Sequence, residues 1–188
     1  MFQAKDFVQH DMSSPANTSA ASATAALKEA GNQAKVYAAR MRLQSAVDQA
    51  DALDAIRDIT GNLIGTEELA VFKVDKRRSE LWLYWSFGVD PNKYAVLEVR
   101  REAKLNDALG GKCVLRPRGS NQNLLGSDDP VSALIPIRID GNTVAVLVLF
   151  RLFPHKTALD DVDHEICEIL SNFAGRAIEP YQSHKGES

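Results

Sequence analysis

The chain has 188 residues, and 22 basic against 25 acidic side chains give it a formal net charge of −3. A mildly acidic chain lacks the positive field that general nucleic-acid and membrane-surface binding require, so we expect no nucleic acid and no membrane among its partners. An apolar share of 45% and a charged share of 25% are typical of a globular domain, which excludes disorder along the whole chain.

Targeting and redox signals are also missing from the sequence. No stretch approaches the roughly 20 apolar residues that span a bilayer, and the N-terminus has no basic region followed by an apolar one. The two cysteines, Cys113 and Cys167, are too few for a disulfide framework. Together these features predict a cytoplasmic protein in a reducing compartment.

The first 42 residues differ in composition from the rest. Residues 13–26 are mostly Ser, Thr and Ala, which offer little apolar surface to offset the entropy of ordering, so we expect residues 1–22 to be disordered. Good helix formers then dominate and predict an N-terminal helical extension at residues 23–42, with Gly31-Asn32 as a break between two helices.

A helical apolar seam follows, with spacings of three and four residues. Its members are Val36, Ala39, Leu43, Ala46, Ala50 and Leu53. Such spacing is that of a short coiled-coil seam, but the same pattern also suits a helix packed on its own domain. Alanine at three of the six positions weakens the coiled-coil interpretation, and both interpretations remain open.

From Glu67 onward the apolar period changes to two, which predicts a sheet. The expected elements are strands at 69–74, 80–87 and 94–100, a helix at 102–109, strands at 112–115, 131–139 and 143–151, and a helix capped by Asp160. Asp140-Gly141 predicts a tight hairpin between the last two strands, and the run 144–150, apolar on both faces, predicts a central strand. The polar loop at 117–130 is expected to be functional or mobile.

Four segments in this order resemble the GAF domain, a small-molecule sensor module related to PAS domains. They are 61–65 with 68–75, 81–89 with Gly88 after the second strand, 132–149 with Gly141 in its turn, and 159–163 leading into the terminal helix. Leu159 stands where the family commonly has an aromatic residue.

The resemblance assigns residues 43–181 to a GAF domain and leaves 182–188 as a flexible tail. It implies an α+β fold, with a mainly antiparallel sheet of about five or six strands and helices on both faces. It further implies a ligand pocket between the sheet and residues 94–130, and dimerisation through the terminal helices.

The ligand subclasses of the family have features that this sequence lacks. Cyclic-nucleotide-binding members carry an Asn-Lys pair after the last long strand, where this chain has Phe150-Arg151. Tetrapyrrole attachment needs a reactive Cys beside a His, whereas Cys113 follows Lys112. Methionine-sulfoxide-reducing members use several loop cysteines, and only Cys113 lies in that region. We therefore expect no enzyme activity, and the cofactor stays undefined.

A metal site is not expected either. His164 and Cys167 lie on one side of the last helix, where a metal could touch both, but the second His of the zinc hydrolase motif is missing. Asp160, Asp161 and Asp163 are explained by capping of that helix. We expect a surface His and a Cys at the edge of the core.

Cations gather in the segment that the resemblance assigns to the pocket. Six fall within nineteen residues: Arg100, Arg101, Lys104, Lys112, Arg116 and Arg118. We expect Arg100, Arg116 and Arg118 to face an anionic small molecule, with a solvated basic surface as the alternative. Alternation places Leu81, Leu83, Trp85 and Phe87 on one face of the second strand, where Trp85 and Phe87 either pack in the core or line the pocket.

These features together predict a stand-alone, non-catalytic, cytoplasmic signalling protein. It would act as a GAF-type small-molecule sensor through a homodimer, built on residues 33–60 and 160–178, or through a separate signalling partner. The alternative is a ligand-free GAF scaffold for protein–protein interaction. A long polar loop favours the sensor, whereas a pocket filled by its own aromatic side chains would favour the scaffold.

Overall fold

The structure, a computed structural model, describes residues 16–75, 77, 79–120, 123–126 and 129–179. The chain divides into two units, residues 1–33 and residues 34–188. The tail expected at 182–188 and most of the segment expected to be disordered lie outside the described residues.

The described part of the first unit is helical. Helix α1 (Ala16–Gln44) begins there, within the segment expected to be disordered, and its side chains from residue 21 to residue 31 are exposed. The helix continues through Gly31 and Asn32, so the break expected at this pair does not occur. A glycine costs a helix only about 1 kcal/mol relative to alanine, and the flanking helix formers offset that cost.

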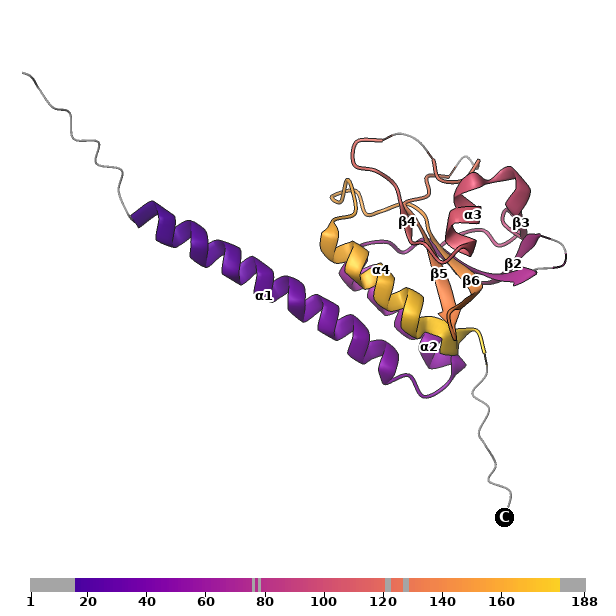
Figure 1. Cartoon of the computed structure of the whole chain (residues 1–188), viewed down its shortest axis with the longest axis horizontal. Coiled ribbons are helices and arrows are strands. Elements are labelled where there is room, and N and C mark those ends of the chain that lie inside the picture. The colour runs from indigo at the N-terminus through magenta and orange to yellow at the C-terminus, as the bar shows by residue number, and fades with distance from the viewer. Residues whose placement is uncertain (1–15, 76, 78, 121–122, 127–128, 180–188) are drawn as a thin grey trace, which may run out of the picture. The chain divides into compact units, whose positions relative to one another are not determined.

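The second unit contains a six-stranded antiparallel sheet with the strand order β3-β2-β1-β6-β5-β4 (Figure 1). The strands are β1 (Leu69–Asp75), β2 (Glu80–Phe87), β3 (Val96–Glu98), β4 (Val114–Leu115), β5 (Ala133–Ile139) and β6 (Asn142–Leu149). All the expected strands are present. The two edge strands, β3 and β4, are shorter than expected.

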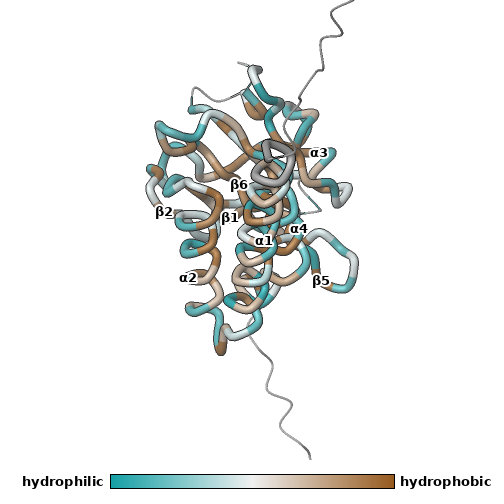
Figure 2. The backbone as a smooth tube through the Cα atoms, turned by 90° about the vertical axis from the view of Figure 1, so that its left-hand side faces the viewer, coloured by the Kyte–Doolittle hydropathy of each residue, from teal (hydrophilic) through white to brown (hydrophobic). Residues whose placement is uncertain are grey.

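The central hairpin follows the turn chemistry of its sequence. Asp140 and Gly141 have φ angles of 50° and 77°, the left-handed pair that a type I′ turn requires. In β6, the residues from Ala145 to Leu149 are fully buried on both faces, which confirms the predicted central strand. Figure 2 shows the hydrophobic colouring of β1 and β6 in the interior of this unit.

One face of the sheet is covered by α2 (Gln49–Ile59) and α4 (Asp161–Phe173) (Figure 1). Three seam residues, Ala39, Leu43 and Ala46, are at most 3% exposed and pack in this helix-side core. For these positions the own-domain interpretation of the seam is therefore confirmed.

The seam is also interrupted, since α1 ends at Gln44 and a second helix starts at Gln49. The carboxylate of Asp48 caps this second helix by accepting a hydrogen bond from the Asp51 N–H at 2.8 Å. A π-helical turn (Thr60–Ile64) then leads to β1. The 3-10 turn η3 (Ala174–Ala177) follows α4 and contributes buried alanines to the same core.

The other face is covered by the 3-10 turn η2 (Val99–Arg101), by α3 (Ala103–Leu109) and by the described parts of the long loop. Leu124 and Leu125 of that loop are buried in this second core, and the Gly126 N–H donates to the Glu102 carboxylate at 2.8 Å. The loop is therefore docked where the structure describes it. Helices lie on both faces of the sheet, which confirms the predicted α+β fold class.

Candidate functional site

The pocket expected between the sheet and residues 94–130 is largely filled by apolar side chains. Phe72 and Phe150 of the sheet side meet Leu105 of α3 and Leu125 of the loop, all at most 3% exposed. A cavity of about 390 Å³ remains at the end of this layer, beside the turns that join β1 to β2 and β5 to β6. Among the described residues, the charged side chains in its lining are Asp75 and Glu80.

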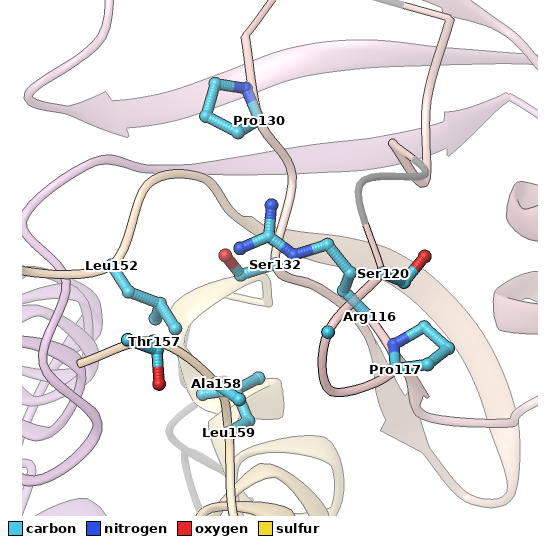
Figure 3. A pocket seen from close by; sticks show the side chains of 10 residues that line it. Arg116, Pro117, Ser120, Pro130, Ser132, Leu152, Thr157, Ala158 and Leu159 are labelled. Carbon is cyan, nitrogen blue, oxygen red and sulfur yellow. The ribbon is translucent and has the colours of Figure 1, made fainter.

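A second cavity, of about 360 Å³, lies at the β4 edge of the sheet (Figure 3). The segment after β4 forms one wall, the start of β5 forms the floor, and the loop between β6 and α4 forms the opposite wall. The lining residues are Arg116, Pro117, Gly119, Ser120, Pro130, Ser132, Leu152, Thr157, Ala158 and Leu159. We call this space the edge cavity.

Arg116 is the charged residue among those that line the edge cavity. Its backbone N–H donates to the Ser132 carbonyl at 2.9 Å, which extends the β4–β5 ladder by one rung and fixes the position of the residue. Its side chain is partly buried and reaches toward Ser132 and Pro130 (Figure 3). Among the described residues, no hydrogen-bond or ion-pair partner satisfies this guanidinium group.

Ser132 contributes a second unused polar group. Its backbone N–H donates to the Leu149 carbonyl at 2.8 Å, so the main chain is fully used. The residue is 1% exposed, and within the described part of the chain its Oγ has no hydrogen-bond partner. A buried hydroxyl without a partner costs free energy, which makes this residue of the cavity lining a candidate contact for a ligand.

The opposite wall of the edge cavity is tied to the start of α4. Lys156 donates to the Asp163 carboxylate at 2.6 Å, and the same carboxylate accepts the Asp160 N–H at 2.8 Å in a capping box. Burial raises the pKa of Asp163 despite the lysine beside it. Because these contacts lie next to Leu159, they hold that wall in place.

The structure brings two of the three predicted anion-facing arginines to the edge cavity. Arg116 lines it, and the exposed Arg118 lies at its border, where Nε donates to the Leu159 carbonyl at 3.4 Å. Arg100 is exposed in η2, on the other side of the long loop, and does not line the edge cavity. The three arginines are therefore not gathered on the covered face of the sheet, and the described cavity that Arg116 lines lies at the sheet edge.

Trp85 and Phe87 lie on the face of the sheet opposite to α3. The β1–β2 register shifts between Val71 and Phe72, so Trp85 pairs with Val71, whereas Leu83 pairs with Phe72. This bulge turns Trp85 toward the helix-side core, while Leu83 faces the α3 side. Phe87 is 39% exposed on the helix side, and the pocket expected under residues 94–130 receives neither aromatic residue.

Both cysteines are buried in the helix-side core. Burial raises the pKa of Cys113 to about 12, with a further contribution from the nearby Glu168 carboxylate. Burial raises the pKa of Cys167 as well. A thiolate is therefore strongly disfavoured at either position.

The described residues also show no cluster of three or more His, Cys, Asp or Glu side chains able to hold a metal ion. Within the same part of the chain, no helix combines the length and apolarity needed to cross a membrane.

Comparison with known proteins places the fold. No protein-family model matches the sequence, and no curated protein matches it. The GAF domain of A. aeolicus nlh2 in an inactive state has a TM-score of 0.58 at 14% identity, covering 80% of this chain and 96% of that one. The GAF domain of an Acinetobacter phosphoenolpyruvate-protein phosphotransferase has a TM-score of 0.57 at 15% identity, covering 78% and 94%.

A third similar structure is an enzyme, the free methionine-R-sulfoxide reductase of Neisseria meningitidis in complex with its substrate. Its TM-score is 0.57 at 16% identity, and 80% of this chain and 92% of that chain are covered. The chain therefore has the GAF fold, as the four sequence segments indicated. The fold occurs in domains of signalling proteins and in an enzyme. The fold alone therefore does not identify the function, which has to be argued from the residues of the site.

Proposed function

We propose that this protein is a non-catalytic, cytoplasmic signalling protein whose GAF domain senses an anionic small molecule at the edge cavity. The observation that carries the proposal is the pairing of two unused groups there, the Arg116 guanidinium and the Ser132 hydroxyl. A bound anion would satisfy both with charge-assisted hydrogen bonds, which are roughly twice as strong as neutral ones.

The state of the cysteines supports a regulatory rather than a catalytic role. Reduction of a sulfoxide in a domain of this fold would need accessible thiolates in the loops. Cys113 and Cys167 are instead buried in the helix-side core, with pKa values raised by that burial. Neither cysteine lines the edge cavity.

The output of the sensor would pass through α4, because the cavity wall formed by Thr157, Ala158 and Leu159 continues directly into the α4 capping box. A ligand that binds one arrangement of this wall better than another shifts the population of that arrangement. The shift would reach a second copy of the chain or a separate signalling protein at the helix-covered face.

A binding screen on the full chain tests this function. Small carboxylates, phosphate monoesters and nucleotides should be compared by thermal shift and by isothermal titration calorimetry. At least one anion should raise the melting temperature, and Arg116→Gln should weaken its binding about 10- to 150-fold, which corresponds to about 1.5–3 kcal/mol. Arg100→Gln is the matched control, because Arg100 is exposed away from the cavity. If no anion binds, or if Arg116→Gln has no effect, the sensor function is refuted.

The filled α3 face favours a second candidate, a ligand-free scaffold that acts through homodimerisation. An open groove of about 410 Å³ runs between α1 and α4 and is lined by Val36, Arg40, Ile169 and Phe173, among others. The apolar side chains of Tyr37 and Met41, 65% and 44% exposed, lie on the same part of α1. Sedimentation of Tyr37→Glu and wild-type protein would test this candidate, which fails if the wild-type protein is monomeric at high micromolar concentration.

A further inference from the structure

We infer that the ligand of the edge cavity is a small monocarboxylate with a short apolar body. This inference rests on the proposed function and names the ligand class of the same site. The alternatives with comparable charge chemistry are phosphate monoesters and nucleotides, and three features of the cavity argue against them.

The first feature is the charge of the lining. Among the described residues of the lining, Arg116 supplies one positive charge, and the other nine are uncharged. A single carboxylate balances that charge, whereas a phosphate monoester brings about −1.5 to −2 and a nucleotide more, so part of the ligand charge would be buried without a partner. Arg118 does not add to the lining, because it is exposed and its Nε donates to the Leu159 carbonyl.

The second feature is the geometry of the donors. The planar guanidinium of Arg116 presents paired N–H groups that match the two oxygens of a carboxylate. The Ser132 hydroxyl, buried and unpaired among the described residues, can donate one further hydrogen bond to the same carboxylate. In Figure 3 the hydroxyls of Ser120 and Thr157 point away from the guanidinium, so they do not extend the donor set toward a third or fourth oxygen.

The third feature is a set of apolar side chains in the lining, from Pro117, Pro130, Leu152, Ala158 and Leu159, although polar atoms supply most of the exposed lining surface. These side chains can pack against the short hydrocarbon part of a ligand. The volume of about 360 Å³ lies near the lower end of the range for ligand pockets, about 300–1,000 Å³, which favours a compact molecule.

The test uses the full chain and four probes that differ in one property each. The probes are isovalerate, its neutral amide isovaleramide, isobutyl phosphate and acetate. The binding of each probe is measured by isothermal titration calorimetry and saturation-transfer NMR. Ligands of this size bind in the millimolar range even in a well-matched site. Isovalerate should bind more tightly than acetate, because of its apolar body, and more tightly than isobutyl phosphate. Isovaleramide should bind at least tenfold more weakly than isovalerate, since it carries no charge.

Variants assign the binding to the edge cavity. Arg116→Gln should weaken isovalerate about 10- to 150-fold, Arg116→Lys should weaken it less, and Ser132→Ala should weaken it by a smaller factor of about 2 to 10. Lys112→Gln is the control, because Lys112 is exposed and does not line the cavity. If the protein binds isobutyl phosphate more tightly than isovalerate, and Arg116→Gln weakens that binding, the ligand is not a monocarboxylate but the proposed anion-sensing function is retained. Absence of Arg116-dependent binding by any anion would overturn both.

Discussion

The ion pair between Lys156 and Asp163 offers a sharp test of how the wall of the edge cavity is held. The Asp163 side chain is 3% exposed, and Lys156 lies 2.6 Å from it. Lys156→Met removes the positive partner and leaves the carboxylate buried. Removing one partner of a buried pair costs about 3–5 kcal/mol, and we expect the lower end, about 3 kcal/mol at neutral pH, because the Lys156 side chain is 21% exposed.

The cost should depend on pH with a defined sign. Burial already raises the pKa of Asp163 in the folded protein, and the loss of Lys156 removes an interaction that lowers it. Below the carboxyl pKa of the unfolded chain both states carry the proton, so the penalty for burying the charge disappears. The penalty returns as pH rises through the folded-state pKa. The destabilisation by Lys156→Met should therefore be largest at about pH 7 and should shrink toward about pH 4.

Urea unfolding of wild type and variant at the two pH values measures this difference. The matched control is Lys104→Met, since Lys104 lies 3.8 Å from Asp107 in a pair whose side chains are 48% and 47% exposed. Such an exposed pair contributes about 0–1 kcal/mol at either pH. The reasoning is refuted if Lys156→Met costs no more than the control, or if its cost is the same at both pH values.

Three further predictions concern other parts of the fold. Gly88 has φ of +73°, and a Cβ at this position would lie 2.0 Å from the Glu67 carbonyl oxygen, so Gly88→Ala should lower the free energy of unfolding in urea by well over 2 kcal/mol. Gly141 has φ of +77° but open space around it, so Gly141→Ala should lower the free energy of unfolding by only about 1–2 kcal/mol. Because the pKa of Cys113 is raised from 9.0 to about 12, its thiolate population at mildly alkaline pH should be about a thousandfold lower than in the unfolded chain, and iodoacetamide should label it only after denaturation. Leu43→Glu should unfold the domain rather than produce a folded monomer, since Leu43 is 2% exposed; loss of the circular-dichroism melting transition would show this.

The strands and the turn were predictable because their determinants are local. The period-two pattern of β1 and β2, the Asp140-Gly141 turn and the acidic start of α4 each act within a few residues. The coiled-coil interpretation of the seam is wrong at Leu43 for the opposite reason. A heptad spacing does not say whether the apolar side of a helix meets its own sheet or a second chain, and in this protein the sheet takes Leu43.

The orientation of Trp85 was not predictable from alternation. Strict alternation assigns Leu83 and Trp85 to the same face, but one bulge in β2 separates them. A bulge needs no special residue at its site, so the sequence carries no clear signal for it. Of the two placements expected for Trp85, core or pocket, the structure shows the core, and this single shift of register places both aromatics on the face away from residues 94–130.

The candidate site itself was only half visible in the sequence. The excess of cations in the sequence pointed to Arg116. The second polar residue of the candidate site is Ser132, which directly precedes the apolar strand β5 and carries no signal in the sequence. Its hydroxyl becomes a signal only in the folded chain, where it has no hydrogen-bond partner among the described residues and belongs to the lining of the cavity. The opposite wall, Leu152 to Leu159, comes from a third segment that no local pattern connects to the other two.

The position of the edge cavity bears on how a GAF fold with a filled α3 face could still respond to a ligand. A molecule between Arg116 and Leu159 touches the β4 edge and the residue that immediately precedes the Asp160 cap of α4. The cap is rigidly held, because Asp163 joins it to Lys156 in the same loop. If the proposed ligand binds there, a change at the cavity would reach the start of α4 along adjacent residues of one loop. From the α3 face it would have to cross the close-packed sheet core, which resists small displacements.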